Sequence, residues 1–419
     1  MLPSLHFHAI DRCRICKNKT LIEVLSLGNQ CLTGVFPKKA DERIHRAPLE
    51  LVKCHGKDAC GLVQLRHSVD ADTMYGVNYG YRSSLNSSMV HHLKLKVEKL
   101  SQQVSLARND TVLDVGSNDG TLLSFYPDTV ERIGMDPTIA KFIRYYPSDI
   151  HAIPDFYSAK NFRHYFGNQK AKIITSIAMY YDLEDPLSFT QDIRETLAPE
   201  GIWHFEQSYL LSMLENNSYD TICHEHLEYY SLHQIQWMAE RCGLRILNVE
   251  FNTVNGGSFA VTACHSNAPY QTHKNTLNQI LANEKAAGLD TLEPYDKFKT
   301  RVFAHREHLL TTLDEIRMEN RSVIGYGAST KGNVILQFCG LTEKEIPAIA
   351  EVNADKFGAY TPGTRIPIIS EEEAHQLKPD FLLAMPWHFR NSLVSKEKDY
   401  LERGGLMIFP LPSIEIVNK

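Results

Sequence analysis

The sequence predicts an α/β protein of three domains, a small cysteine-rich one followed by two that each contain a mainly parallel sheet. Two observations predict the sheets: apolar runs at 112–115 and 323–326 each lead into a glycine-rich turn and then a helix-like segment. That order of strand, turn and helix is typical of doubly wound folds. Paired cysteines at 13–16 and 54–60 predict the separate first domain. We expect domain boundaries at 1–72, 73–265 and 266–419.

Composition and charge exclude several classes of protein. The chain has 419 residues, of which 43% are hydrophobic and 22% charged, as in ordinary globular proteins. A net charge of -6 argues against general affinity for nucleic acid or anionic membranes. No apolar run approaches the roughly 18 to 20 residues that span a bilayer, and the N-terminus lacks a secretion-signal pattern. We therefore expect a cytoplasmic protein, for which a monomer is compatible with the lack of coiled-coil heptads.

The cysteines of the first domain have the spacing of a metal site. Cys13 and Cys16 can present two sulfurs to one tetrahedral ion from a single tight turn. Cys54 and Cys60 form the second pair, with five intervening residues where zinc ribbons usually have about two to four. This enlarged loop makes His55 a rival ligand. We predict a structural Zn²⁺ held by the four cysteines, because a small domain needs such a staple; the alternative is a set of free buried thiols.

The turn after the strand at 112–115 indicates a nucleoside-binding domain. It runs from Asp114 to Gly120 and precedes a predicted helix at 121–125, and a second strand ends in Asp136, which can accept both hydroxyls of a ribose. The turn lacks the spacing of dinucleotide-binding loops, and its Asp-x-Gly-x-x-x-Gly form resembles motif I of class I S-adenosylmethionine-dependent methyltransferases. The candidate cofactor-binding residues are Asp114, Gly116, Asn118, Gly120, Asp136 and Ser176.

Alternating segments continue this domain. We predict strands at 172–177, 201–206, 244–250 and 257–264, and helices at 186–197 and 232–242. On this order, residues 220–231 follow the carboxyl end of a strand, where open α/β sheets bind their ligands.

The segment 220–231 carries the acid/base candidates His224, Glu225 and His226. An imidazole titrates near neutral pH, and an adjacent carboxylate can orient it or raise its basicity. One of these histidines can therefore remove a proton from carbon or oxygen. The alternatives are a polar loop, or a metal site in which Cys223 is a further ligand.

The third region begins with polar residues at about 266–320, which suit helices, and then repeats the strand-and-turn pattern. The strand at 323–326 leads into a glycine-rich turn that contains Lys331, a second candidate for holding phosphate. Apolar runs at 348–353 and 381–387 predict further parallel strands. Two nucleotide-sized sites indicate a cofactor and a nucleotide-linked substrate, unless the second turn is only structural.

Taken together, these motifs resemble the three-domain sugar C-methyltransferases from end to end. The residues that carry the resemblance are the four cysteines with Cys60-Gly61-Leu62-Val63-Gln64-Leu65, Tyr79-x-Tyr81-Arg82-Ser83, the loop 114–120, His224-Glu225-His226, and Gly325-Tyr326-Gly327-Ala328 with Lys331-Gly332-Asn333. The resemblance implies a zinc-binding domain, a class I methyltransferase domain and a Rossmann-like C-terminal domain that helps to bind the nucleotide.

The resemblance also implies a reaction: S-adenosylmethionine-dependent methylation of carbon 3 in a nucleotide-linked 4-keto-6-deoxyhexose. His226 would be the base with Glu225 beside it, and His224, Tyr79 or Tyr81 would donate to the developing oxyanion. The implied substrate-binding residues are Tyr79, Tyr81, Arg82, Cys223, Tyr180, Ser329, Lys331 and Asn333. Family members carry a tyrosine at the position of Cys223, a histidine near Tyr180, and a histidine and an arginine at the positions of Asn255 and Ala260, so sugar recognition is expected to differ here.

Three other functions fit parts of the sequence. A small-molecule O- or N-methyltransferase would use His226 to deprotonate a hydroxyl or amine. An RNA methyltransferase with a zinc ribbon is disfavoured by the acidic charge balance. A non-catalytic sensor of nucleotide sugars is disfavoured by the clustered acid/base residues, which a binding protein does not need.

Overall fold

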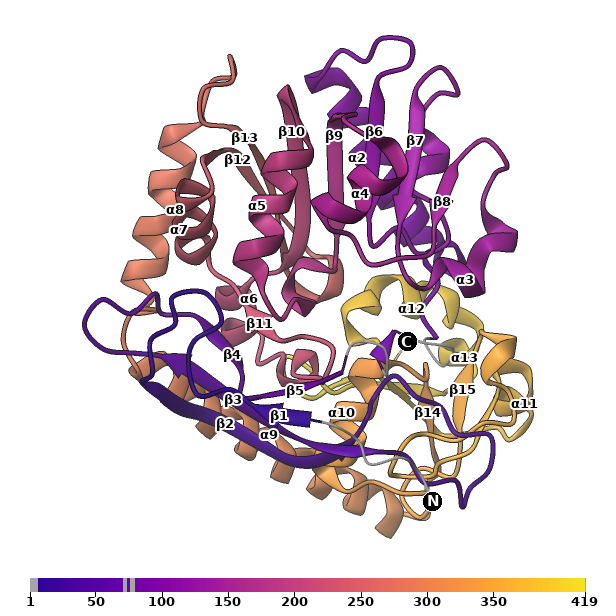
Figure 1. The fold of residues 1–419 in the computed structure, drawn as a ribbon. Helices are drawn as coiled ribbons and strands as arrows, with labels where there is room; N and C mark the ends of the chain where they lie inside the picture. The colour runs from indigo at the N-terminus through magenta and orange to yellow at the C-terminus, as the bar shows by residue number, and fades with distance from the viewer. Residues whose placement is uncertain (1–6, 71–73, 76–79, 419) are drawn as a thin grey trace.

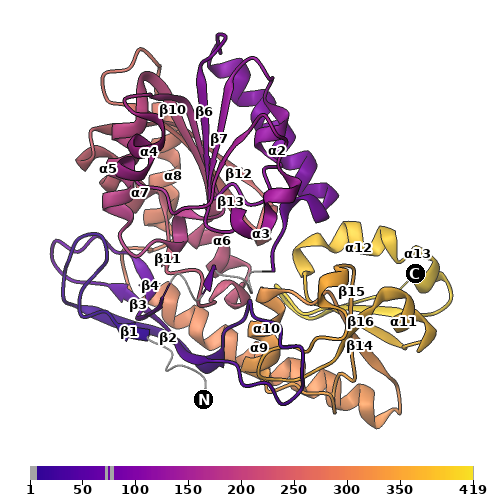
Figure 2. The same cartoon turned by 45° about the vertical axis from the view of Figure 1, so that its right-hand side comes forward.

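Three large β-sheets and a short two-stranded ribbon organise the chain in the computed structural model, which describes residues 7–70, 74–75 and 80–418 (Figure 1). Each of the three predicted domains contains one of the large sheets, and the predicted α/β fold class is confirmed. The seven-stranded sheet of the second domain lies above the other two large sheets, as both views show (Figure 2). Among the described helices, none has an apolar stretch long enough to cross a lipid bilayer.

The N-terminal sheet is antiparallel with strand order β11-β4-β3-β2. Its strands are β2 (Leu21–Cys31), β3 (Arg46–Cys54), β4 (Val63–Leu65) and β11 (Glu228–Tyr229), and the ribbon pairs β1 (Phe7–Ala9) with β5 (His67–Val69). Strand β11 comes from the second domain, lies within the acid/base segment 220–231, and pairs with β4. The acid/base segment is therefore anchored to the cysteine-rich domain.

The central sheet has the order β12-β13-β10-β9-β6-β7-β8, and β13 is antiparallel to both of its neighbours. Its strands are β6 (Thr111–Val115), β7 (Glu131–Met135), β8 (His151–Ile153), β9 (Ala171–Ile177), β10 (Leu197–Ser208), β12 (Leu244–Asn252) and β13 (Ser258–His265). The structure confirms all six predicted strands of this domain. The helix expected at 121–125 is wrong: only a 3-10 turn forms, Leu123–Phe125, because Pro127 holds Tyr126 in an extended conformation.

The helices of this domain start at clear sequence signals. Asn86 caps α2 with its side chain, and Asp185 caps α5, whose first residue is Pro186. The helices are α2 (Ser87–Gln103), α3 (Ile139–Phe142), α4 (Ala159–Phe166), α5 (Pro186–Thr196), α6 (Leu210–Glu215) and α7 (Leu232–Arg241). The predicted helices at 186–197 and 232–242 are thus confirmed.

The C-terminal sheet has the order β16-β15-β14-β17-β18-β19 and is parallel except for β19. Its strands are β14 (Val323–Tyr326), β15 (Ile349–Glu351), β16 (Ile368–Ser370), β17 (Phe381–Ala384), β18 (Leu406–Phe409) and β19 (Glu415–Val417). The helices are α8 (Lys274–Ala286), α9 (Glu293–Met318), α10 (Thr330–Cys339), α11 (Glu371–Gln376), α12 (Arg390–Lys396) and α13 (Lys398–Glu402). The predicted parallel strands and the helices at 266–320 are confirmed.

The domains share hydrophobic cores. Leu25, Leu51 and Leu65 of the N-terminal sheet pack in one cluster with α9 and the C-terminal sheet. In both views α9 runs along the base of the molecule, below the N-terminal sheet and the C-terminal domain (Figures 1 and 2). The cysteine end of the first domain packs instead with Trp203 and Tyr230 of the central domain. Because cores cross the domains, the boundaries at 72/73 and 265/266 stay a prediction.

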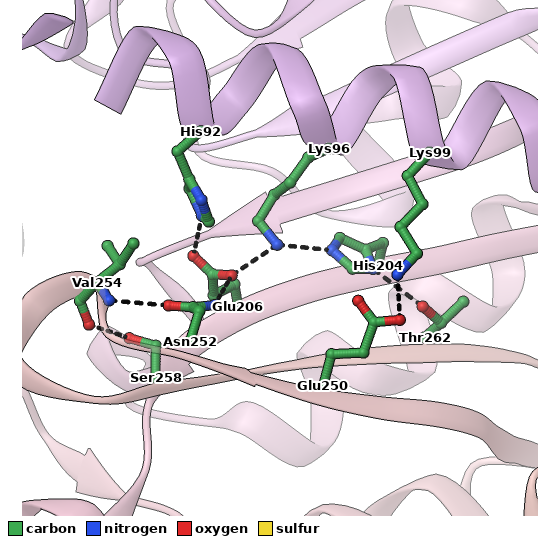
Figure 3. A network of polar contacts seen from close by, with 10 residues as sticks. All are labelled: His92, Lys96, Lys99, His204, Glu206, Glu250, Asn252, Val254, Ser258 and Thr262. Carbon is green, nitrogen blue, oxygen red and sulfur yellow. Dashed lines mark hydrogen bonds and ion pairs between the residues drawn. The ribbon is translucent and has the colours of Figure 1, made fainter. Parts of the chain in front are cut away.

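A buried polar network fastens α2 to the central sheet (Figure 3). Glu206 of β10 accepts from His92 at 2.7 Å and Asn252 at 2.6 Å, and forms an ion pair with Lys96 at 2.6 Å. Burial opposes the ionisation of Glu206, but His92 and Lys96 lower its pKa to about 2. The residues just before α2 donate backbone N–H groups to the loop 114–120. Because the network fixes α2, it also holds the segment that contacts this loop.

Candidate active site

The structure sets the tautomer of His226. Its Nδ1 lies 2.8 Å from the backbone carbonyl of Thr221, which can only accept, so Nδ1 carries the proton and Nε2 is left as an acceptor. The ring lies against Tyr181, with centroids 4.2 Å apart. Burial and the nearby charge of Lys331 lower the pKa of His226 to about 3, so the imidazole is neutral at pH 7. A neutral ring with an unprotonated Nε2 has the form that a general base requires.

Glu225 is not the group that orients His226, because Thr221 already holds the Nδ1–H. The Cys223 thiol donates weakly to its Oε2 at 3.7 Å. Its Oε1 instead faces Gly34 of the first domain, and burial raises the pKa of Glu225 to about 7. The expectation that the carboxylate adjacent in sequence orients His226 was therefore wrong, because neighbouring side chains on this loop point in different directions.

Replacing Glu225 by glutamine is expected to stabilise the protein at pH 8 and to have little effect at pH 5. The pKa of Glu225 is raised from 4.5 to about 7, so the folded state binds this proton more tightly than the unfolded state does. The resulting stabilisation is present below pH 4.5 and is lost as pH rises through 7. The amide avoids that loss, and the free energy of unfolding at pH 8 should rise by roughly 2 kcal/mol. Urea unfolding at both pH values measures this; equal effects would contradict it.

His224 docks the segment on the first domain. Its Nε2 donates to the carbonyl of Ala47 in β3 at 3.0 Å, and burial lowers its pKa to about 4. A neutral imidazole has one N–H, which this bond uses, so the predicted donation from His224 to an oxyanion was wrong. His224 and Glu225 line a cavity of about 180 Å³ whose other walls come from His8, Ser68, Val69, Asp70, Met74, Tyr75, Asp182, Glu184 and Leu227.

The predicted substrate contact Tyr180 is a core residue. Its side chain is 1% exposed, it stacks on Tyr230, and its hydroxyl lies 2.6 Å from that of Thr190. The adjacent Tyr181 is the one that reaches His226. The two tyrosines lie in one 3-10 turn, Tyr180–Asp182, where successive side chains diverge, so the sequence alone could not distinguish them.

Residues 114–120 form a tight loop at the carboxyl edge of the central sheet. Gly116 and Gly120 have φ angles of 75° and 77°, and a Cβ at either position would meet Met179 or Tyr146 at 2.9 Å. The backbone N–H of Asn118 donates to Asp136 at 2.8 Å and so ties the loop to the end of β7. Gly116, Asn118, Gly120 and Asp136 thus lie together at this edge, while both oxygens of Asp136 accept within the protein, from Asn118 and from Thr138, so their contact with a cofactor stays a prediction.

Two other predicted cofactor contacts are occupied by the sheet itself. Asp114 accepts from Thr175 at 2.6 Å, and burial raises its pKa to about 7. Ser176 is fully buried and its hydroxyl accepts from Trp203 at 3.2 Å, so that side chain is not available to a cofactor. Sequence reasoning placed Ser176 at the right strand but on the wrong face, since side chains alternate along a strand.

The four predicted zinc ligands come together. Their sulfur atoms all lie within 4.8 Å of one another, with Cys13 and Cys60, and likewise Cys16 and Cys54, 3.5 Å apart. Tetrahedral zinc with bonds of about 2.3 Å places sulfurs roughly 3.8 Å apart, so the set fits this ion. His55 lies outside the group, which is the one such cluster in the described part of the chain.

The predicted substrate contacts before α2 lie beside the cofactor loop. The carbonyl of Tyr81 accepts from the Asn118 side chain at 3.2 Å, and the Arg82 guanidinium stacks over Tyr145 at 4.2 Å. Tyr79 lies outside the described residues.

Of the predicted contacts around α10, Lys331 is the one beside the acid/base segment. Its Nζ donates to the carbonyl of Asn255 at 2.8 Å, and its charge lowers the pKa of His226. Ser329 caps α10 by accepting from the Gly332 N–H at 3.0 Å. Asn333 is 1% exposed and donates to the Thr33 carbonyl at 2.7 Å, so the prediction that it contacts substrate was wrong.

Sequence reasoning missed a group of residues on the C-terminal side of the site. Trp387 donates to the carboxylate of Asp220 at 2.8 Å, and Asp220 lies close enough to Lys331 to raise the pKa of that lysine against the effect of burial. The Nδ1 of His388 is buried and finds no hydrogen-bond partner among the described residues. The signal that the sequence offered was the position of Trp387 and His388 just after β17, because ligands bind at the carboxyl ends of parallel strands.

Comparison with known proteins identifies all three parts of the chain. Family models match a zinc binding domain over residues 13–75, a methyltransferase domain over 89–249 and a C-methyltransferase C-terminal domain over 253–412. The C-methyltransferase NovU of Streptomyces niveus is 30% identical, over 98% of this chain and 97% of its own. The chain belongs to the C-methyltransferase family. It is accordingly an S-adenosylmethionine-dependent methyltransferase with a zinc-binding domain.

Two solved structures resemble less than half of this C-methyltransferase. An S-adenosylmethionine-dependent methyltransferase from Clostridium acetobutylicum has a TM-score of 0.35 and 11% identity, covering 42% of this chain and 92% of its own. An O-methyltransferase family protein from Burkholderia thailandensis has a TM-score of 0.34 and 16% identity, covering 44% and 59%.

Removing the metal is expected to disorder the acid/base segment as well as the cysteine loops. Gln234 of α7 donates to the carbonyl of Cys60 at 2.8 Å, and β11 pairs with β4, which follows Cys60 closely. We expect one zinc per chain by elemental analysis. Stripping it with a chelator, or making Cys16→Ser, should lower the melting temperature by roughly 5 °C or more. An unchanged melting temperature after complete zinc removal would contradict this prediction.

Proposed function

We propose that this C-methyltransferase adds a methyl group to carbon 3 of a nucleotide-linked 4-keto-6-deoxyhexose. The observation that carries the proposal is His226, whose Nε2 is unprotonated and whose neighbour Lys331 comes from the C-terminal domain. A base beside a cation fits a substrate that has both an acidic C–H bond and a diphosphate. The resemblance to sugar C-methyltransferases supports the same substrate class.

His226 would remove the proton on carbon 3. The electron pair of that C–H bond moves toward the adjacent carbonyl oxygen, which makes this proton far more acidic than an ordinary C–H proton. S-adenosylmethionine, which the loop 114–120 and Asp136 would hold, would supply an electrophilic methyl group to carbon 3 of the enolate and would leave as the neutral thioether. His226 finally releases its proton to solvent. The chain's main contribution is to position these groups within reacting distance.

Lys331 would make this base depend on the substrate. In the protein alone, its charge disfavours a protonated His226 and so weakens the base. A diphosphate held by Lys331 neutralises that charge, which raises the pKa of His226 when the correct ligand is bound. The C-terminal domain would thereby couple nucleotide recognition to proton removal in the central domain.

The direct test incubates the protein with S-adenosylmethionine and separate panels of GDP- and dTDP-linked 4-keto-6-deoxyhexoses in heavy water. Proton NMR and mass spectrometry follow the products. One methyl group on carbon 3 would support the proposal and identify the nucleotide. Methylation of a different carbon would correct the position. No binding and no hydrogen exchange with either panel would refute the sugar substrate and favour a small-molecule O- or N-methyltransferase.

A further inference from the structure

A segment of the first domain crosses to the C-terminal domain beside the acid/base residues. This strap (residues 32–38) follows β2. Its Thr33 carbonyl accepts from Asn333 at 2.7 Å, and its Pro37 carbonyl accepts from the Tyr360 N–H at 2.9 Å. Lys356 lies over the ring of Phe36 at 4.5 Å. The strap backbone is therefore held on both sides of Gly34.

Gly34 is the point where the strap meets Glu225. A Cβ at this position would overlap Oε1 of Glu225, would lie 3.5 Å from its Cδ, and would lie 3.8 Å from Oγ1 of Thr330 in α10. The φ angle of Gly34 lies outside the left-handed region, so the backbone itself would accept alanine. Space for the carboxylate, and not conformational freedom, is what requires glycine here.

The carboxylate is the part that would move if Gly34 were enlarged. The strap backbone is tied to Asn333 and Tyr360, whereas Glu225 Oε1 is the end of a flexible side chain. We propose that Gly34 is a positioning residue, through which the first domain holds the Glu225 carboxylate against α10 in the working geometry of the site. This inference rests on the proposed function, in which the segment containing Glu225 performs C-methylation.

The test measures kcat, KM and S-adenosylmethionine affinity for Gly34→Ala. We expect kcat to fall roughly 10- to 100-fold, because Glu225 directly precedes His226 in the chain and moving its carboxylate shifts the backbone that carries the base. Cofactor affinity should stay at its wild-type value, and the variant should remain folded at pH 7. Lys38→Ala is the control, because it changes the strap at an exposed side chain that donates to the Asp355 carbonyl, away from Glu225. Wild-type kcat in Gly34→Ala would overturn the proposal.

A double-mutant cycle separates this effect from general damage to the strap. Glu225→Asp shortens the side chain by one methylene and makes room for a Cβ at position 34. In that background, adding Gly34→Ala should change kcat by less than about 2-fold, because the two changes act on one contact. The same fold loss in both backgrounds would show that Gly34 acts elsewhere and would overturn the proposal.

The same variants can also be compared by the pH dependence of their stability, which needs no enzymatic activity. This measurement distinguishes a failure of the inference about Gly34 from a failure of the proposed function. If wild-type protein methylates none of the sugars, the proposed function fails and the loss of stability between pH 5 and pH 8 becomes the measure. A carboxylate pushed from its buried position should lose much of its pH dependence in Gly34→Ala. An unchanged pH dependence would mean that Gly34 does not hold Glu225.

Discussion

Replacing His226 by alanine is expected to lower kcat for C-methylation by roughly 10³-fold, the largest effect of any single substitution that we predict for activity. The substitution removes Nε2, which the bond from Nδ1 to the Thr221 carbonyl leaves as the unprotonated atom of the ring. It should equally abolish exchange of the carbon 3 proton with heavy water. Cofactor affinity should not change, because the loop 114–120 and Asp136 lie at the carboxyl ends of β6 and β7 and not on the segment that carries His226.

His226→Asn is the matched variant for this experiment. Its amide nitrogen can donate to the Thr221 carbonyl as Nδ1 does, so it keeps the local fold while lacking the base. Both variants should therefore lose exchange and methylation together. If exchange survived in His226→Asn, the base would have to be another residue, and His388, which also lies near Lys331, would be the next candidate.

The parts of this protein that were predictable from sequence are those encoded locally. The spacing of Cys13, Cys16, Cys54 and Cys60 predicts a tetrahedral thiolate site because one turn presents each pair of sulfurs, and the structure brings all four together. The strands at 112–115 and 323–326 were predictable because a short apolar run leading into a glycine-rich turn has few other solutions. Each cysteine pair, and each strand with its turn, lies within about ten positions of sequence, although the two cysteine pairs are far apart.

The features that escaped prediction depend on a partner distant in sequence. Glu228 and Tyr229 form a strand only because Gln64 and Val63 offer an open sheet edge. The side chain of Asn333 does not face the ligand, because it donates a hydrogen bond to a carbonyl 300 positions earlier in the chain. The direction of the Glu225 carboxylate likewise follows from the approach of the strap. No local pattern distinguishes these outcomes from their alternatives, because tertiary packing overrides local preference.

Arg14→Met is expected to cost about 3 to 5 kcal/mol of folding stability, the largest effect on stability that we predict. Arg14 lies between two zinc ligands and is 3% exposed, and it donates to the Leu65 carbonyl and the Ser68 hydroxyl at 2.6 Å each. Its Nε lies 3.5 Å from the carboxylate of Glu228, which is 1% exposed. Burial raises the pKa of Glu228 well above its usual range and Arg14 opposes that shift, so without the arginine this carboxyl, two residues from His226, would be held protonated and would lose the cation that faces it.

The double variant Arg14→Met/Glu228→Met decides whether the charge pair causes this loss. Replacing both members of a buried ion pair by apolar residues of similar size is often nearly neutral, whereas removing one member leaves an uncompensated charge. Urea unfolding of the two variants should therefore show a large loss for Arg14→Met and recovery of most of it in the double variant. Recovery of stability without recovery of kcat would show that the pair also aligns β11, and through it His226, with the zinc-binding domain. An equal loss in both variants would assign the effect to the hydrogen bonds that Arg14 makes with β4 and β5, and not to its charge.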